Sequence, residues 1–165
     1  MKVLILQRAQ TISLLSVSIF TLWGIDAYAS CSLIKNNDAR ALCRAKAQGS
    51  VGQCSFIKDT DQRAYCRASV DKKSSQCSFI KNNDLRSRCR AEMGGRRSSG
   101  QCSFVRDPDQ RAFCRAKSKK SSSQCSLIRN GDLRAFCRAV IKRNPGQCSL
   151  IKSSDLRTQC RSESR

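Results

Sequence analysis

The sequence contains no histidine, one tryptophan and only 5% aromatic residues. Without histidine there is no Cys-His or Ser-His-Asp arrangement for nucleophilic catalysis. A glycine-rich phosphate loop and a zinc-type cysteine quartet are also missing from the sequence. We therefore expect no enzyme, no cofactor and no metal site. The shortage of large apolar side chains also argues against one large core for a chain of 165 residues.

What the chain does have is a unit that recurs six times. Each copy begins Cys-Ser, continues with a bulky apolar residue and Ile or Val, and has a second cysteine twelve positions after the first. The first cysteines are 23, 23, 25, 23 and 23 residues apart. We number repeat positions from the first cysteine as position 0. The spacing predicts a repeat array, in which each copy packs on its neighbours.

All twelve cysteines lie in the repeats, which indicates structural disulfides formed in an oxidising compartment. We expect one bridge within each repeat, because two short antiparallel helices would bring positions 0 and 12 to similar heights. Pairing between neighbouring repeats, such as Cys43 with Cys54, is the alternative. A further alternative is a reduced protein that holds Cu(I) through its thiolates. The cysteines are Cys31, Cys43, Cys54, Cys66, Cys77, Cys89, Cys102, Cys114, Cys125, Cys137, Cys148 and Cys160.

Position 5 predicts where the longer helix of each repeat begins. It holds only Asn, Asp or Ser, whose side chains accept hydrogen bonds from an open helix N-terminus. Position 7 is Asp in every copy, an anion in the first turn where the helix dipole favours it. A helical wheel places positions 8, 11 and 12 on one arc and arginine positions 9 and 13 on the opposite side. The predicted fold is all-α: six short disulfide-stapled helical hairpins in a solenoid-like array of about 23 residues per repeat.

Residues 1–29 have the pattern of a signal peptide. Lys2 and Arg8 precede an apolar stretch, and Ala27 and Ala29 occupy the two positions that a signal peptidase reads. We expect cleavage after Ala29 and a periplasmic or secreted protein. An uncleaved anchor would need roughly 20 apolar residues, and the run here is shorter. Lipidation of Cys31 is a third reading, disfavoured by Tyr28 and by the place of that cysteine in a repeat.

The remaining residues divide into 30–93, with repeats 1 to 3, and 102–165, with repeats 4 to 6. Between them, residues 94–101 belong to the one longer interval and are rich in Gly, Arg and Ser, which predicts a hinge. Position 11 becomes Arg88 in repeat 3 and Gln159 in repeat 6. One interpretation is that each of these copies ends a three-repeat stack with a polar face. The other interpretation is neutral variation.

The formal net charge is +20, and the positive charge follows the repeat. Stacked repeats would align positions 4, 9 and 13 into a cationic stripe that suits anionic partners. Arginine binds phosphate and carboxylate through two parallel hydrogen bonds, so we take both arginine columns as candidate anion-binding residues. Alternatively, they pair with the Asp of an adjacent repeat. The columns are Arg40, Arg63, Arg86, Arg111, Arg134 and Arg157 at position 9, and Arg44, Arg67, Arg90, Arg115, Arg138 and Arg161 at position 13.

The functional hypothesis is an exported cationic repeat protein that binds lipopolysaccharide, acidic polysaccharide, nucleic acid or a membrane surface. We assign the repeat aromatics to hairpin interiors, and therefore expect no base-specific recognition of nucleic acid. Two other classes stay open. One is a scaffold or inhibitor that binds an acidic protein partner, and the other is a secreted effector or toxin.

Overall fold

The computed structural model describes residues 31–165, so the predicted signal peptide lies outside the described residues. Within this range the chain is helical and forms no strand. Six α-helices alternate with five 3-10 helices. The α-helices are α2 (Asn37–Gln48), α3 (Thr60–Asp71), α4 (Asn83–Met93), α5 (Pro108–Lys119), α6 (Gly131–Lys142) and α7 (Ser154–Glu163). The 3-10 helices are η1 (Val51–Phe56), η2 (Ser74–Phe79), η3 (Gly95–Phe104), η4 (Ser122–Leu127) and η5 (Pro145–Leu150).

Each α-helix begins where position 5 predicts. The Asn36 side chain accepts a hydrogen bond from the Ala39 amide, and Asp59 accepts one from Gln62. The same bond forms in the other four repeats. Because position 5 itself is extended, the chain turns there from the short helix into the long one.

In repeats 2 to 6 a disulfide clamps the 3-10 helix to the α-helix that follows, and in repeat 1 it joins Cys31 to α2. The six bridges are Cys31–Cys43, Cys54–Cys66, Cys77–Cys89, Cys102–Cys114, Cys125–Cys137 and Cys148–Cys160, with Cα atoms 5.6 or 5.7 Å apart. Pairing between neighbouring repeats does not occur. Six disulfides fit an oxidising environment outside the cytoplasm.

The core is made from small side chains and cystines. Each repeat buries its two cysteines, the Ile or Val at position 3, and the Ala at position 14 where present. These residues leave little apolar volume per repeat, so the bridges and the contacts between repeats must supply much of the stability.

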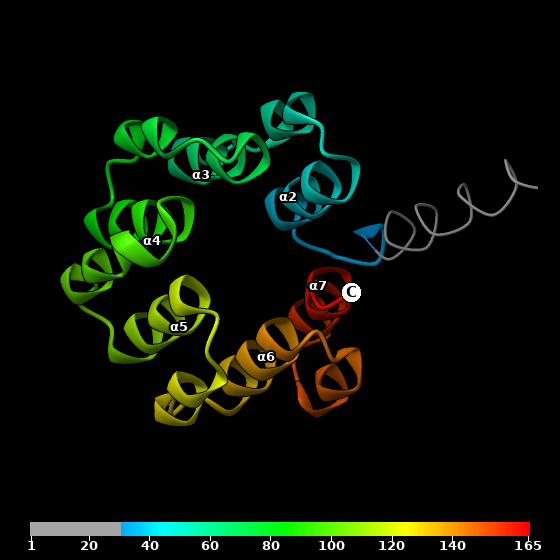
Figure 1. The fold of residues 1–165 in the computed structure, drawn as a ribbon. Coiled ribbons are helices and arrows are strands. Elements are labelled where there is room, and N and C mark those ends of the chain that lie inside the picture. Colours follow the sequence, from blue (N-terminus) through cyan, green and yellow to red (C-terminus); the bar gives the residue numbers. More distant parts are fainter. Residues whose placement is uncertain (1–30) are drawn as a thin grey trace, which may run out of the picture.

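The six repeats close into a ring. Figure 1 shows α2 to α7 arranged around a centre, with the 3-10 helices outside them. Helix α7 contacts α2, as each α-helix contacts its sequence neighbours. Closure repeats the bond used within the array: the Asp155 carboxylate accepts from the amides of Lys35 and Asn36, at 3.2 Å each. The solenoid-like array therefore has no free ends among the described residues.

This closure bears on two expectations from the sequence. Repeats 3 and 6 do not end stacks, because α4 contacts α5 and α7 contacts α2. Arg88 and Gln159 instead face the centre of the ring, where both line the same cavity. Residues 95–101 of the expected hinge belong to η3 (Gly95–Phe104), a 3-10 helix that contacts α4 and α5. Whether it bends stays a prediction.

Candidate functional site

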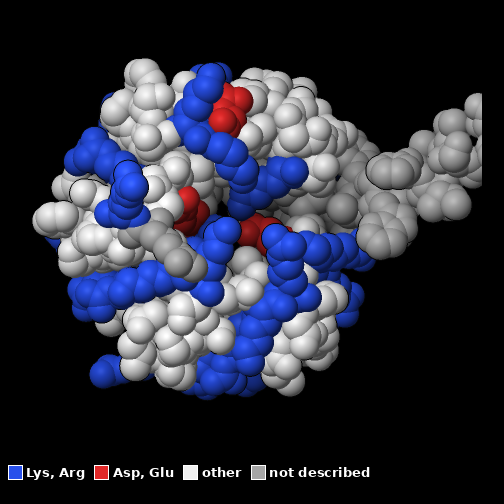
Figure 2. Space-filling model, in the orientation of Figure 1, with Lys and Arg blue, Asp and Glu red and all other residues white. Residues whose placement is uncertain are grey.

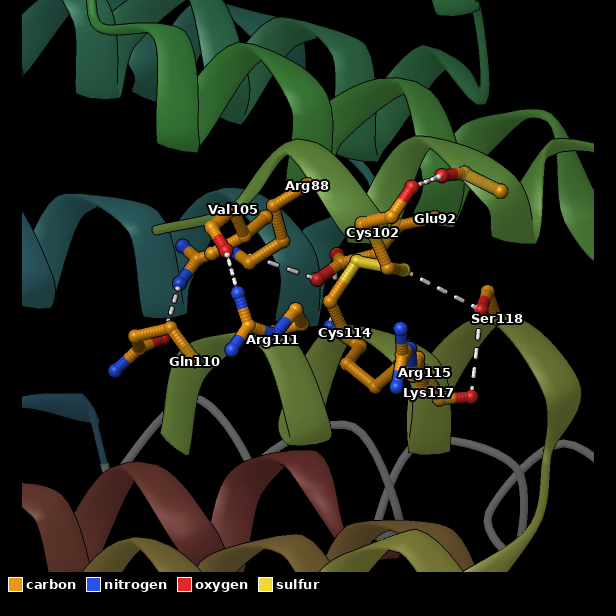
Figure 3. The surroundings of a disulfide bond; sticks show 12 residues. Arg88, Glu92, Cys102, Val105, Gln110, Arg111, Cys114, Arg115, Lys117 and Ser118 are labelled. Carbon is orange, nitrogen blue, oxygen red and sulfur yellow. Dashed lines mark hydrogen bonds and ion pairs between the residues drawn. A yellow bond between two sulfur atoms is a disulfide. The ribbon is translucent and has the colours of Figure 1, made fainter. Parts of the chain in front are cut away.

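In five of the six repeats the position 9 arginine turns back onto its own repeat. In four copies the guanidinium donates to the carbonyl at position 3, just beyond the short helix; Figure 3 shows this bond from Arg111 to Val105, 2.9 Å long. The other three are Arg86 to Ile80, Arg134 to Ile128 and Arg157 to Ile151. Arg40 donates to the carbonyl of Lys35, at position 4. These half-buried side chains hold the turn between the two helices, so much of their hydrogen-bonding capacity is already used.

The position 13 arginines lie on the outer surface. Arg67, Arg90, Arg138 and Arg161 are exposed, whereas Arg44 and Arg115 are half-buried. Position 13 is about 200° around the helix from position 11, which lines the centre of the ring. Position 4 is exposed in every copy, through Lys35, Lys58, Lys81, Arg106, Arg129 and Lys152. Among the three basic columns, position 4 in all six repeats and position 13 in four of them are therefore exposed to an outside partner.

The fixed aspartates join one repeat to the next. Asp61 accepts from the backbone amides of Lys81 and Asn82, at 2.8 Å each. Asp38, Asp109, Asp132 and Asp155 make the equivalent pair of bonds. Within residues 31–165 no direct ion pair joins these aspartates to the position 9 arginines. The aspartates thus cap the start of the neighbouring helix, and no ladder of ion pairs with those arginines forms.

The two backbone donors lower the pKa of Asp38, Asp61, Asp109 and Asp132 below the ordinary value of 3.8. Nearby cations of the next repeat contribute in the same direction, such as Lys81 and Arg86 for Asp61. Across the longer interval, Asp84 makes neither of these bonds to repeat 4. This junction is held by other contacts, including a hydrogen bond of 2.8 Å from Arg88 to Gln110.

A cluster of charges occupies the centre of the ring. Most of its members come from position 15, which holds Lys46, Ser69, Glu92, Lys117, Val140 and Glu163. Ion pairs of 3.0 Å join Lys46 to Glu163 and Lys117 to Glu92. Arg88 lies 3.7 Å from Glu92, and the Tyr65 hydroxyl donates to Glu92 at 2.6 Å. Figure 3 shows Arg88, Glu92 and Lys117 close to the Cys102–Cys114 bridge.

Burial and pairing act against each other on these groups. Burial alone would raise the pKa of Glu163, but Lys46, Lys117 and hydrogen bonds lower it to about 2. The pKa of Glu92 is also lowered, because Lys117 and Arg88 outweigh burial. Burial disfavours the charged form of Lys117, yet Glu92 raises its pKa above the usual range. Glu92, Glu163 and Lys117 are therefore all charged at neutral pH.

Two cavities meet at this cluster, and both are lined by Lys46, Tyr65, Lys117 and Glu163. One has a volume of about 500 Å³ and extends toward the ends of the α-helices, past Val70 and Met93. The other has a volume of about 550 Å³ and extends toward the helix starts, past Asn36 and Asp59. In Figure 2 acidic atoms lie near the middle of the ring, among basic side chains. No position 9 or position 13 arginine lines the described cavities.

The assignment of all repeat aromatics to the interior is wrong for half of them. Tyr65, Phe113 and Phe136 at position 11 are buried, and the two phenylalanine rings meet edge to face at 5.7 Å. Phe56 and Phe79 at position 2 are largely exposed, as is Phe104. Position 2 follows a buried cysteine by two residues in a helix with three residues per turn, so it points outward.

Sequence reasoning did not find the charge cluster, although the sequence carries a signal for it. Glu92 and Glu163 are the only two glutamates, and both occupy position 15. Each has a lysine at position 15 of the following repeat, provided that repeat 1 follows repeat 6. The placement of these two glutamates and two lysines in the sequence therefore hints at ring closure.

Among residues 31–165, no set of three or more Cys, Asp or Glu side chains is grouped to hold a metal ion. The twelve sulfurs are all in bridges, so the Cu(I) hypothesis would require the reduced chain. None of the described helices has the length and apolarity to span a bilayer. No protein-family model, curated protein or solved structure matches the chain.

Proposed function

We propose that this protein is exported through a cleaved signal peptide and binds anionic polymers or surfaces of the cell envelope through its outer cations. The observation that carries the proposal is the exposure of position 4 in all six repeats and of position 13 in four of them. Placed around a ring, these cations offer many equivalent contacts to a ligand that repeats its own negative charges.

The two arginine columns differ in their contacts, and this difference supports ligand binding through position 13 together with position 4. Position 9 is engaged with backbone carbonyls in five repeats, for example in the bond from Arg134 to Ile128. Five of the six fixed aspartates are engaged with backbone amides, and among the described residues none of the six pairs directly with an exposed cation. The exposed guanidinium groups of Arg67, Arg90 and Arg138 are suited to phosphate, sulfate or carboxylate.

The test compares two variants that lose the same charge. In the first, Arg67, Arg90 and Arg138 are replaced by Gln. In the second, the exposed cations Lys119, Lys142 and Arg165, which lie outside the three columns, are replaced by Gln. Binding of the oxidised proteins to heparin and to duplex DNA is measured across a salt series, and circular dichroism checks the fold.

We expect the column variant to lose more affinity than the control. On DNA, the slope of log K against log salt should fall by roughly 0.9 for each phosphate contact removed. Equal losses in both variants would show that net charge alone attracts the polyanion and would overturn the role of position 13. Binding that ignores salt would contradict the proposal as a whole.

A further inference from the structure

The outer surface carries a second repeated feature, which the proposed function does not use. Position 2 holds a large apolar side chain in every copy, and every one of them is exposed. We call these six residues the apolar belt: Leu33 (72% exposed), Phe56 (69%), Phe79 (70%), Phe104 (66%), Leu127 (62%) and Leu150 (64%). Single exposed apolar residues are ordinary on protein surfaces, but the same exposure in six of six repeats is a pattern.

The fold does not explain the apolar belt. In each repeat the neighbours at positions 0 and 3, Cys and Ile or Val, are buried and make the core contacts. With three residues per turn, position 2 points away from that core. None of the belt residues lines a described cavity. A polar residue there would leave the packing unchanged, so the belt indicates contact with something outside the ring.

The residue types at position 2 narrow the chemistry of that contact. Three belt residues are Phe and three are Leu. Stacking on a nucleic-acid base or a sugar ring requires a flat aromatic face, which Leu lacks. Apolar volume is what Phe and Leu share, and this suits an acyl chain.

Fixed cations lie directly beside the belt. Arg111 donates to the carbonyl of Val105, the residue after Phe104, and Arg86 donates to the carbonyl of Ile80, the residue after Phe79. Arg134 and Arg157 make the corresponding bonds beside Leu127 and Leu150. Two residues after each belt residue comes an exposed Lys or Arg at position 4. An apolar side chain next to cations is the combination that binds the headgroup and acyl boundary of an anionic membrane.

We propose that the apolar belt docks the protein onto the surface of an anionic phospholipid bilayer. Belt side chains enter the boundary between headgroups and acyl chains, while the exposed cations at position 4 meet lipid phosphates. The inference rests on the proposed function, since it names the anionic surface that the outer cations contact.

The test uses vesicles of phosphatidylcholine with and without phosphatidylglycerol, and heparin as a soluble polyanion without acyl chains. Phe56, Phe79 and Phe104 are replaced by Ser in one variant and by Leu in a matched control. We expect the oxidised wild-type protein to sediment with vesicles that contain phosphatidylglycerol. The Ser variant should lose about tenfold or more in vesicle affinity, because its apolar contact is gone, and should keep its heparin affinity. The Leu variant should retain both.

Other outcomes separate the two proposals. Equal vesicle binding by the wild type and the Ser variant would overturn the role of the belt, while salt-dependent heparin binding through position 13 would leave the proposed function standing. Wild-type protein that binds heparin and not vesicles would likewise overturn the role of the belt and leave the proposed function standing. If the wild-type protein binds neither vesicles nor heparin, both proposals are wrong. If sedimentation velocity shows that the Ser substitutions dissociate an oligomer and vesicle binding is unchanged, the belt is a contact between copies and the membrane inference is wrong.

Discussion

The outer surface and the centre of the ring follow opposite rules. Outside, each repeat presents the same kinds of residue at positions 2, 4 and 13. In the centre, position 15 differs between adjacent repeats, and its lysines pair with its glutamates as Lys46 with Glu163 and Lys117 with Glu92. A surface repeated six times suits a ligand with many equivalent groups, whereas a centre of specific pairs selects which repeats become neighbours.

Reducing the disulfides should destabilise the protein most, because the bridged repeats carry both the outer surface and the centre of the ring. Each bridge closes a short loop and stabilises by roughly 3 kcal/mol in the loop-entropy model. Helices of this length are marginal in water without tertiary support. We expect the helical circular dichroism signal to collapse when the protein is reduced. Mass spectrometry should show a gain of about 12 Da, two hydrogens for each of six bridges. A fully reduced chain that keeps its helical signal would contradict this account.

Replacing Glu92 by Ala should remove ion pairs at the centre of the ring and leave the outer surface unchanged. The Glu92 side chain is 3% exposed, and its removal leaves the half-buried Lys117 and Arg88 without their carboxylate. Breaking a buried ion pair in this way typically costs about 3–5 kcal/mol. Urea unfolding would measure the loss.

The control for Glu92 exchanges both charges for apolar groups. Glu92→Met combined with Lys117→Met removes the anion and one of its cations together, so it should recover much of the stability lost in Glu92→Ala. Binding of heparin by the double variant should stay close to that of the wild type, since the outer surface is intact. An unchanged stability in Glu92→Ala would show that the central pairs do not hold the ring.

Local structure could be predicted from the repeat. Six copies of one pattern reveal which positions are invariant, and Asn36, Asp59 and their equivalents are helix N-caps because of chemistry within three residues. The cysteine spacing likewise favours bridges within each repeat, since both partners lie in one hairpin. The fold class therefore follows from short-range chemistry.

Ring closure and the role of the aspartates could not be derived in the same way. Closure depends on the small rotation between repeats, which sums over six copies and which no single position encodes. Asp61 has its partners 20 and 21 residues further along the chain, so its local position suggests only a dipole interaction. The outward direction of Phe56 was also missed, because a bulky side chain beside a cysteine suggests a core residue.

An intermediate effect is expected at the junctions between repeats. Asp61→Asn removes a carboxylate that accepts two amides of the next repeat, at 2.8 Å each, whereas Asp84→Asn removes one that makes no such bonds. Both residues lie in the first turn of their helix, so the dipole contribution cancels in the comparison. We expect Asp61→Asn to lower the thermal midpoint by more than Asp84→Asn. Equal shifts would show that the junction bonds add nothing to stability.

The same bonds set a pH dependence. A carboxyl whose pKa is lower in the folded state stabilises the fold at pH values above its unfolded pKa, and this contribution is lost as pH falls through the folded pKa. The ordinary values are 3.8 for Asp61 and 4.5 for Glu163, and the Glu163 pKa is lowered to about 2. Stability should therefore be level between about pH 5 and 8, where no histidine titrates, and should fall from about pH 4.5 toward pH 2. In Asp61→Asn the loss of stability at acidic pH should be smaller than in the wild type.

The smallest effect is expected at the ends of the α-helices, where the conformation repeats but the residue type does not. Position 18 has a positive φ in five repeats, with Gly49 and Gly95 in two of them and Lys or Arg in the other three. Lys120 is in the left-handed region at φ 52°, which a side chain disfavours. Lys120→Gly should therefore raise the free energy of unfolding by about 0.5–1 kcal/mol. Lys119→Gly, one residue earlier and inside α5, should lower it by a similar amount, so opposite signs in urea unfolding at adjacent lysines would establish that backbone conformation, and not the lost charge, sets the stability there.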